Sequence, residues 1–437
     1  MTHLFYNILL TSFLIFASPY FLIRALISGR FRREMIERMG FFPTLSDGKP
    51  VWVHAASVGE VFCTIPLLKA LKKEFPQRPI ALTTMTRTGN ERAKMIPEAD
   101  RVFFLPIDYP LAIRRILRNM NPGLVLLAET ELWPNLLMSC GKNGIPVILF
   151  NGRVSEKSFR RYLFFRSFFR DCLKGISLFL MQTEEDRKRI VEIGAALDRT
   201  RVVGNLKFDQ PAPPLAQEAL AEMAKSLNLQ GKETLLIAGS THSGEEEILL
   251  GLFKDLKKFD PHLVLVLAPR HLDRLEEVER VLKKESILWS RKTSLSSDQG
   301  RPAREQNEVP EVILLDTMGE LMNLYSLGTL VFIGGTLVPV GGHNPLEPLF
   351  FKKPVLFGPH MFHFSEISRH LIQAGGAIQA GGKEELAFHL KRLLSDEGGR
   401  KEMGEKGYQF LQRHQGATGR MMGEIRPFLR DIADRRF

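Results

Sequence analysis

The sequence predicts an α/β protein with two doubly wound domains, preceded by an apolar N-terminal helix. The chain has 437 residues, more than one hydrophobic core usually spans, so two domains of roughly 200 residues are expected. From residue 51 onward, short apolar runs alternate with helical patterns. This alternation is typical of parallel sheets that are covered by helices on both faces. An uncharged stretch over residues 4–23 precedes these runs.

The first predicted element is a helix over this stretch, LFYNILLTSFLIFASPYFLI. It is about 30 Å long and just spans a bilayer. A signal peptide is not expected, because a basic region before the stretch and a small-residue cleavage site are both missing. We predict a single-pass anchor, with a helix lying on the membrane as the alternative, since Asn7 and Pro19 interrupt the apolar run. Basic residues follow it at Arg24, Arg30, Arg32, Arg33 and Arg38, which places the rest of the chain in the cytoplasm.

The next predicted elements are short, continuously apolar strands. In the first half they cover residues 51–56, 79–84, 101–105, 124–129, 145–150 and 176–182, and in the second half 234–239, 262–268, 311–316, 329–334 and 354–358. The stretch 208–219 between the halves is rich in proline and reads as a linker. The predicted divisions are an anchor (1–28), a first domain (29–208), a linker (209–225), a second domain (226–403) and a helical tail (404–437). By analogy with this fold class, the tail is expected to cross back to the first domain.

Ligands of doubly wound domains bind just beyond the carboxyl ends of the strands. Polar or glycine-rich clusters occupy these places in both halves, which predicts two sheets that face one another across a shared cleft. The clusters are SVGE (57–60), TELWPN (130–135), NGR (151–153), STHSGEE (240–246), PRH (269–271), TMGEL (317–321) and GTLVPVGGHN (335–344).

Carboxylates dominate two of the clusters in the first half. Ser57 and Glu60 have the spacing of a capping box, which needs no function. Alternatively, Glu60 faces the cleft as a base that removes a proton from an attacking hydroxyl, and Gly59 lets a ligand approach the backbone. Glu129 and Glu131 lie two residues apart. They are either a second acid/base pair or acidic groups that stabilise a helix start.

The clusters of the second half predict a phosphate-bearing ligand. The loop of residues 334–348 is expected to lead into a helix with Asn344 as its N-cap and Pro345 at its first position. Further anion sites are expected around residues 240–242, at Arg270, and at a helix start in residues 315–321. No GxxxxGK[ST] or GxGxxG motif is present, which disfavours a P-loop or dinucleotide enzyme.

Composition narrows the class of partner. The net charge of +11 predicts an anionic partner, and nothing resembles a nucleic-acid-binding module. The segment 153–174 is basic and rich in phenylalanine, so it is either a core-packed amphipathic helix or a membrane-contacting one. The three cysteines contain no CxxC pair, and no DxD motif or His/Cys/carboxylate cluster is apparent, so neither a disulfide framework nor a metal is expected.

Seven motifs together resemble those of the 3-deoxy-D-manno-oct-2-ulosonic acid (Kdo) transferases of Gram-negative bacteria. They are, in chain order, HAASVGE (54–60), AETELWPN (128–135), FNGR (150–153), GNLKFD (204–209), APRH (268–271), DTMGEL (316–321) and GGTLVPVGGHNPLEP (334–348). The resemblance covers essentially the whole chain. It implies a GT-B glycosyltransferase at the cytoplasmic face of the inner membrane. Such an enzyme transfers Kdo from CMP-Kdo to the tetra-acylated, bis-phosphorylated lipid A precursor, without a cofactor.

The resemblance also implies roles for individual residues. The general base is Glu60, and a further essential glutamate is Glu131 or Glu129, with Glu131 favoured. Contacts to the donor CMP-Kdo are implied for Pro269, Arg270, His271, Met318, Gly319, Glu320, Gly341, Gly342, His343, Asn344 and Glu347. Contacts to Kdo or the acceptor are implied for Ser57, Gly59, Arg153, Lys207, Ser240, Thr241 and His242.

The glycine pair 341–342 is expected to let its loop wrap the donor phosphate, and Glu347 to bind the ribose or to cap a helix. Two other functions remain open. One is a GT-B enzyme that uses a UDP-sugar, and the other is a non-catalytic, membrane-tethered protein that binds nucleotide sugars or lipid headgroups.

Overall fold

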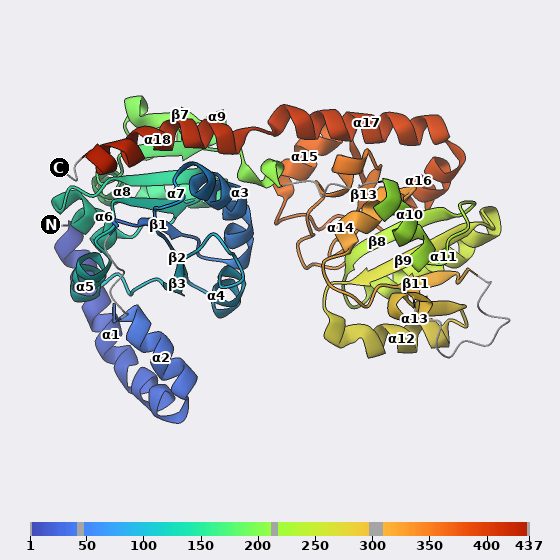
Figure 1. Ribbon diagram of the computed structural model, residues 1–437, viewed down its shortest axis with the longest axis horizontal. Coiled ribbons are helices and arrows are strands. Elements are labelled where there is room, and N and C mark those ends of the chain that lie inside the picture. The colour runs from blue at the N-terminus through green and yellow to red at the C-terminus, as the bar shows by residue number, and fades with distance from the viewer. Residues whose placement is uncertain (1, 42–47, 211–216, 297–308, 435–437) are drawn as a thin grey trace. The chain divides into compact units, whose positions relative to one another are not determined.

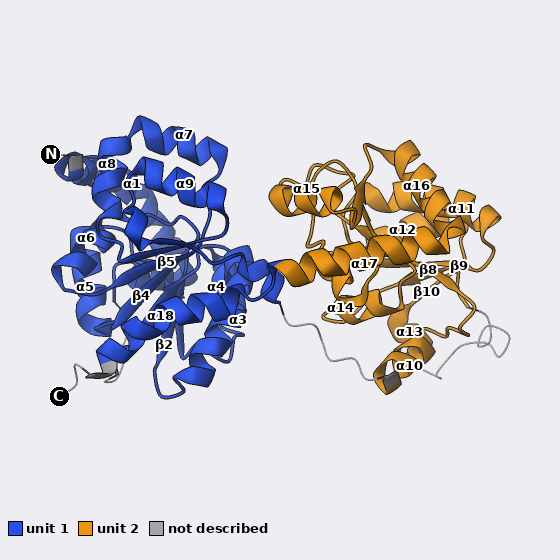
Figure 2. Cartoon of the chain, turned by 90° about the horizontal axis from the view of Figure 1, so that it is seen from above, with its two compact units in different colours: residues 1–211, 414–437 blue, residues 212–413 orange. Residues whose placement is uncertain are grey.

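The computed structural model describes residues 2–41, 48–210, 217–296 and 309–434. It divides into two compact units (Figure 2). Unit 1 comprises Met1–Pro211 and His414–Phe437, and unit 2 comprises Ala212–Arg413. The chain therefore returns to unit 1 after completing unit 2 (Figure 1).

Unit 1 begins with two helices, α1 (Thr2–Ile27) and α2 (Gly29–Arg38). Helix α1 extends beyond both ends of the predicted stretch, and Pro19 lies inside it without ending it. Ser28 ends the first helix and caps the second, because its hydroxyl accepts a hydrogen bond from the N–H of Phe31. The two helices form a hairpin (Figure 1).

The core of unit 1 is a parallel sheet with the strand order β3-β2-β1-β4-β5-β6-β7, which is the doubly wound arrangement. Its strands are β1 (Val51–His54), β2 (Ile80–Thr84), β3 (Arg101–Phe104), β4 (Leu124–Ala128), β5 (Val147–Gly152), β6 (Leu178–Met181) and β7 (Thr200–Val202). Its further helices are α3 (Val58–Glu74), α4 (Arg87–Ala93), α5 (Pro110–Met120), α6 (Pro134–Lys142), α7 (Glu156–Phe164), α8 (Arg166–Leu173), α9 (Glu184–Ile193) and α18 (Ala417–Asp434).

Two apolar layers cover the faces of this sheet. One layer includes Leu67 of α3 and Ile425 of α18, so the last helix of the chain completes the core of the first unit. The other layer includes Ile116 of α5 and Leu136 of α6. Alternate residues of the central strands point into the two layers, which explains why these strands are apolar throughout.

Unit 2 contains a second parallel sheet, in the order β10-β11-β9-β8-β12-β13-β14. Its strands are β8 (Thr234–Thr241), β9 (Leu263–Pro269), β10 (Trp289–Arg291), β11 (Val312–Leu314), β12 (Leu330–Ile333), β13 (Val355–Phe357) and β14 (Ala377–Gln379). Its helices are α10 (Gln217–Ser226), α11 (Glu245–Phe259), α12 (Leu275–Lys284), α13 (Lys292–Ser296), α14 (Leu321–Leu324), α15 (Ser365–Gln373), α16 (Lys383–Ser395) and α17 (Glu397–His414). Helix α10 lies almost wholly within the segment that was expected to be a linker, and it belongs to unit 2.

The predicted fold class is confirmed, and each of the predicted strands is present. Strands β7, β10 and β14 were missed; all three lie at the edges of their sheets and are partly exposed, so they lack a continuous apolar run. The helix expected at Asn344 is wrong, because only a short 3₁₀ turn, Pro348–Phe351, follows. Pro348 has no N–H to donate to the carbonyl of Asn344, so the first hydrogen bond of the predicted helix cannot form.

Candidate functional site

Glu60 is held at the carboxyl edge of unit 1 by the turn between β1 and α3. Ser57 is the N-cap of α3, and its hydroxyl accepts a hydrogen bond from the N–H of Glu60. In return, the Glu60 carboxylate accepts hydrogen bonds from the Ala56 N–H at 2.8 Å and from the Ser57 hydroxyl at 3.0 Å. This is close to the predicted capping box. The same contacts fix the carboxylate in one orientation, so capping and a chemical role are compatible.

The electrostatic environment of Glu60 suits a general base. The pKa of Glu60 is raised to about 7, chiefly by burial and also by the charge of Glu129, while hydrogen bonds from Ala56 and Ser57 partly oppose the shift. The charge of Glu131 also raises it. A carboxyl group with a pKa near the working pH can accept a proton and still be largely ionised beforehand. The site therefore provides a base poised near neutral pH.

The second carboxylate cluster follows β4, which pairs with β1. Glu129 directly follows this strand and has a positive φ of 52°. Such backbone conformations are costly for non-glycine residues and cluster at functional sites. Burial raises the pKa of Glu131, and the charge of Glu129 adds to this effect. Pairing of the two strands thus brings Glu129 and Glu131 close enough to Glu60 for their charges to raise its pKa.

Two predicted basic contacts lie near these carboxylates. The carbonyl of Arg153 accepts a hydrogen bond from the hydroxyl of Thr130, the residue between the two glutamates. Lys207 lowers the pKa of the Cys63 thiol, whereas the carboxylates of Glu60 and Glu129 raise it. Cys63 is buried and lies one turn along α3 from Glu60. The edge of unit 1 therefore combines three acidic side chains with the side chain of Lys207 and the backbone of Arg153.

The sequence reasoning missed a buried polar network beneath this edge. Asn151 has a positive φ of 51°, and its side-chain oxygen accepts the N–H of Leu206 at 3.0 Å. Gln182 donates to the carbonyl of Asn151 and accepts from Asn205. The network joins the segments FNGR and GNLKFD, which are more than 50 residues apart. An asparagine near the end of an apolar strand was the available signal, because a polar side chain there needs hydrogen-bond partners.

Histidines and arginines converge at the carboxyl edge of unit 2. The Nε2 atoms of His242 and His343 are 2.8 Å apart. One of these two atoms must therefore carry a hydrogen and donate it to the other. The ring of His271 packs edge-on against His242. The pKa of His343 is lowered to about 3, chiefly by burial and also by the neighbouring groups His242 and Arg270. Both histidines are therefore neutral near pH 7, and the positive charge that an anion would meet at this edge comes from Arg270.

Asn344, Glu347 and Arg270 form one corner of this edge. The side chain of Asn344 accepts the N–H of Leu346 and donates to Glu347 at 3.2 Å. Burial raises the pKa of Glu347, while Asn344 and the charge of Arg270 lower it. The capping alternative for Glu347 is thus absent, since its partner is the Asn344 side chain and no α-helix begins there.

The glycine-rich loop after β12 is organised around Glu245, the first residue of α11. Its fully buried carboxylate accepts hydrogen bonds from the N–H groups of Gly335, Thr336, Leu337 and His242. These N–H groups are consequently unavailable to a phosphate. This arrangement, together with the missing helix at Asn344, corrects the expectation of a helix N-terminus for an anion at this loop.

The second glycine pair closes the same loop on itself. Gly341 and Gly342 have φ values of +116° and +77°, and both donate to the carbonyl of Gly335. A Cβ atom on Gly342 would lie 2.4 Å from the sulfur of Met361. Glycine is therefore required here by the packing of the loop.

The remaining predicted residues also lie beyond strand ends. Pro269 ends β9, and Ser240 and Thr241 end β8. Met318 is exposed in the turn after β11, and Gly319 has a φ of +87°. Glu320 pairs with Lys292 and accepts from Thr317. The helix start predicted here is only the four-residue α14, too short to provide an anion site by its dipole.

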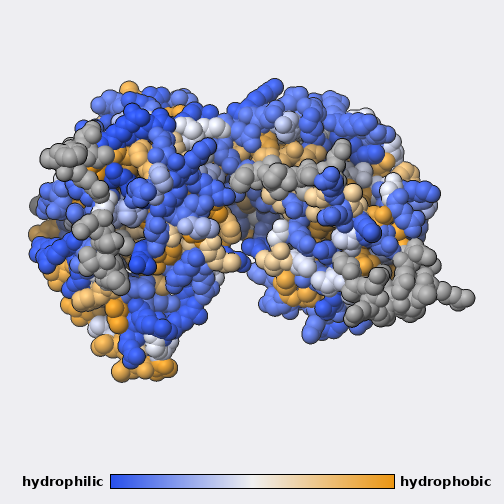
Figure 3. Space-filling model, viewed as in Figure 1, coloured by the Kyte–Doolittle hydropathy of each residue, from blue (hydrophilic) through white to orange (hydrophobic). Residues whose placement is uncertain are grey.

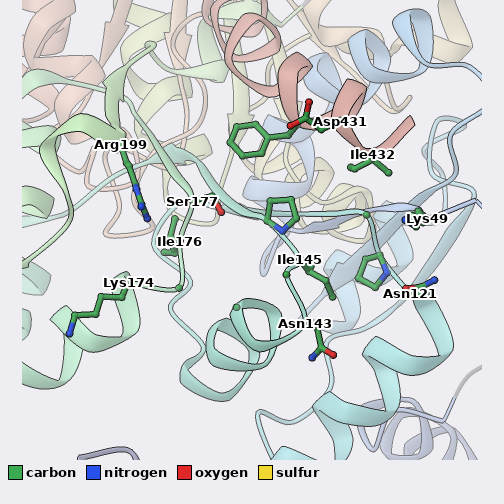
Figure 4. Close-up of a pocket in the computed structure, with 17 residues that line it drawn as sticks. Lys49, Asn121, Asn143, Ile145, Lys174, Ile176, Ser177, Arg199, Asp431 and Ile432 are labelled. Atoms are coloured by element: carbon green, nitrogen blue, oxygen red, sulfur yellow. The ribbon is translucent and has the colours of Figure 1, made fainter. Parts of the chain in front are cut away.

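A separate cavity of about 480 Å³ opens at the amino edge of the unit 1 sheet (Figure 4). Two of the residues that line it are Gly123, which directly precedes β4, and Ser177, which directly precedes β6. It is thus at the opposite end of the strands from Glu60, and we assign it no ligand. Among the described residues, no group of three or more His, Cys, Asp or Glu side chains could hold a metal ion.

The comparison with solved structures defines the class of fold. A glycosyltransferase from Rickettsia africae is similar with a TM-score of 0.55 and 13% identity, covering 89% of this chain and 99% of that one. A UDP-GlcNAc 2-epimerase from Neisseria meningitidis gives a TM-score of 0.54 and 15% identity, covering 82% and 95%. These likenesses concern the fold alone. Two doubly wound units with polar carboxyl edges are the GT-B class of architecture.

The sequence comparisons identify the family. The family described as 3-deoxy-D-manno-octulosonic-acid transferase (kdotransferase) matches residues 33–210. The 3-deoxy-D-manno-octulosonic acid transferase of Haemophilus influenzae is 36% identical over 434 residues, covering 96% of this chain and 98% of that protein. That of Chlamydia muridarum is 31% identical and covers 94% of each chain. The chain belongs to the Kdo transferase family, which confirms the resemblance found in its motifs.

Proposed function

We propose that this Kdo transferase moves Kdo from CMP-Kdo to the tetra-acylated, bis-phosphorylated lipid A precursor, lipid IVA, with inversion of the anomeric carbon. The observation that carries the proposal is the half-buried, hydrogen-bonded Glu60, with a pKa near 7 beside two further glutamates. A protein that only bound a nucleotide sugar or a lipid would have no use for such a base.

In the proposed reaction, the Glu60 carboxylate takes the proton from a sugar hydroxyl of the acceptor. The resulting oxygen nucleophile forms a bond to the anomeric carbon of Kdo. The bond between this carbon and the phosphate oxygen of CMP breaks, and its electron pair leaves with CMP. Direct displacement from the opposite side inverts the anomeric centre. A positioned base typically contributes about 10²–10⁴-fold to such a step.

The groups of unit 2 suit the departing CMP. Arg270 offers a planar donor pair that matches a phosphate. The hydrogen-bonded pair of His242 and His343 adds an N–H donor at the same edge, where burial and, to a smaller extent, neighbouring charges lower the pKa of His343. Preorganised donors of this kind stabilise charge that develops on a leaving group. We assign the ribose contact to Glu347, whose carboxylate lies beside Asn344 and close to Arg270.

Arg153 and Lys207 are suited to the acidic acceptor, because they lie at the edge that holds Glu60. Their positive charges match the phosphates of lipid IVA. We further propose that the reaction needs no metal ion, since cationic side chains are available for the phosphate of CMP.

We place the enzyme at the cytoplasmic face of the inner membrane. Helix α1 is long and apolar enough to cross a bilayer, with a mean hydropathy of 1.7 over its best window. In the basic segment 153–174, Phe159, Phe168 and Phe169 pack against the core. Phe164 and Phe165, in contrast, are exposed at the junction of α7 and α8. The segment thus combines a core-packed face with an exposed aromatic tip.

A donor comparison tests the proposed function. The full-length protein is incubated in mixed micelles with lipid IVA and either CMP-Kdo or radiolabelled UDP-sugars, and the lipid products are separated. We expect transfer from CMP-Kdo alone, and the anomeric configuration of the product, read by NMR, to be inverted. Transfer from a UDP-sugar, or retention of configuration, would contradict the proposal. Tight binding of CMP-Kdo without any transfer would favour the non-catalytic alternative.

A further inference from the structure

Helix α1 is bound to unit 1 close to its N-terminal end. The Tyr6 hydroxyl donates to the carboxylate of Asp108 at 2.9 Å. The side chains of Asn7 and Asn135 exchange two hydrogen bonds, at 2.8 and 3.3 Å. Asp108 and Asn135 are both buried, and Asp108 also accepts the N–H groups at the start of α6. The first turns of α1 therefore complete a polar cluster inside unit 1.

The other end of α1 is held to the same unit through α2. Only Ser28 separates the two helices. Along α2, Arg30 pairs with Glu91 and Glu34 pairs with Arg87. Both partners belong to α4. The Arg38 side chain then donates to the carbonyl of Met85 at 2.6 Å. Helix α2 is thus attached from its first turn to its last.

These contacts conflict with a transmembrane orientation of α1. A spanning helix must place its ends on opposite sides of an apolar layer about 30 Å thick. The first turns of α1 instead contact unit 1 directly, and its other end leads into α2, which is bound to the same unit. The surface and the catalytic edge of this unit need water. Pulling Tyr6 and Asn7 across a bilayer would leave buried polar groups of Asp108 and Asn135 without these partners, which is costly.

The outward face of α1 is nevertheless strongly apolar. Figure 3 shows hydrophobic residues gathered at the end of unit 1 where the α1–α2 hairpin lies. The inner stripe, which includes Tyr6, Asn7, Leu10 and Leu14, is only partly exposed. The exposed large apolar side chains of α1 are Leu4, Phe5, Ile8, Leu9, Phe13, Ile15, Phe16, Tyr20, Leu22, Ile23, Leu26 and Ile27.

Exposed arginines accompany this apolar face. Arg32 and Arg33 point to solvent from α2, and Arg24 covers the rings of Tyr20 and Phe31 at the tip of the hairpin. Apolar groups beside arginines match the acyl region and the anionic headgroups of a single leaflet.

We infer that the α1–α2 hairpin is a monotopic membrane anchor. The outer face of α1 is immersed in the cytoplasmic leaflet, and both ends of α1 stay on the cytoplasmic side of the membrane. The occupant of the exposed face is lipid. The inference deepens the proposed function by defining how the enzyme reaches a lipid acceptor. It replaces the single-pass anchor predicted from the sequence.

Topology is tested with single cysteines in the full-length protein. The native Cys63, Cys140 and Cys172 are buried, so an introduced thiol dominates labelling by a membrane-impermeant maleimide. Thr2→Cys reports the N-terminus, and Ser395→Cys, on an exposed position of unit 2, marks the cytoplasm. We expect both variants to be labelled in inside-out vesicles and neither in intact spheroplasts. Labelling of Thr2→Cys in spheroplasts alone would establish a spanning helix and overturn the inference.

Immersion of the outer face is tested by flotation with vesicles of phosphatidylethanolamine and phosphatidylglycerol. Replacing Phe13 and Phe16 together with Ser should reduce the bound fraction several-fold, because Phe16 is 85% exposed in α1. Phe388→Ser is the matched control, since Phe388 is 63% exposed but lies in unit 2. Unchanged flotation together with loss of a dimer in detergent would instead identify this face as an interface between two copies. Neither readout depends on transferase activity, so failure here leaves the proposed reaction separately testable.

Discussion

The charge of Glu129 raises the pKa of Glu60 across two neighbouring parallel strands. The two residues are 69 positions apart in the chain. Glu129 directly follows β4, and Glu60 lies in the first turn of the helix that follows β1. One glutamate thereby tunes the basicity of another. This relationship leads to the first two predictions.

Replacing Glu60 with Gln should lower kcat by about 10²–10⁴-fold, because the amide cannot accept the acceptor's proton. The affinity for CMP-Kdo should stay unchanged, since the proposed donor contacts lie in unit 2. Steady-state kinetics and a direct binding measurement check the two expectations. Glu402→Gln, on the surface of unit 2, is the control. Wild-type turnover in the Glu60 variant would assign the base elsewhere.

The pH profile should show the influence of Glu129. Glu60 must be ionised to act, so kcat/KM should rise with pH, reach half of its maximum near pH 7 and level off at higher pH. Removing the negative charge with Glu129→Gln lowers the pKa of Glu60 and should move this rising limb to lower pH. An unshifted limb, with kcat still measurable, would show that the limb belongs to another group.

Arg270→Lys should raise the Kd for CMP by about tenfold, because lysine keeps the charge but loses the paired donors of the guanidinium. Isothermal titration with CMP measures the effect. Arg280→Lys, on the exposed side of α12, should bind CMP as the parent does. Equal affinities for both variants would remove Arg270 from the donor site.

Glu245→Gln should destabilise the protein by about 2–4 kcal/mol, since a buried carboxylate that accepts several N–H groups is replaced by a group with one acceptor and an unpaired amide. Glu247→Gln, two residues further along and exposed, is the matched control and should change stability little. Chemical denaturation monitored by tryptophan fluorescence compares them. Equal stabilities would mean that the loop does not depend on this carboxylate.

Chelation should leave activity intact. The proposed mechanism relies on Arg270 and the His242–His343 pair for the phosphate charge, so EDTA should change the rate of Kdo transfer less than twofold. A loss of activity that a divalent ion restores would contradict this expectation.

Much of the architecture follows from local sequence pattern. The continuous apolar runs predicted each long strand, because strands covered on both faces need no polar side. Ser57, Thr86, Ser155 and Thr183 each cap a helix with their hydroxyl groups, as their residue types indicate. The family could also be recognised from its motifs, which are contiguous stretches of a few residues.

Part of the candidate site could not be predicted from local sequence pattern. The glycine-rich loop indicated an anion site, but its N–H groups bind Glu245, which lies 90 or more residues earlier in the chain. Likewise, α1 has the length and composition of a spanning helix, yet Tyr6 contacts Asp108 more than 100 residues away.

The sequence by itself determined the two parallel sheets, the cap of α3 at Ser57 and the family. Periodicity and capping depend on neighbours within one or two turns, so they are visible in the linear order of residues. Only the tertiary structure decided which carboxylate is buried beside which, whether a loop's N–H groups are already occupied, and where both ends of α1 are held. Those outcomes depend on strand order and close packing, which join residues that no local pattern connects.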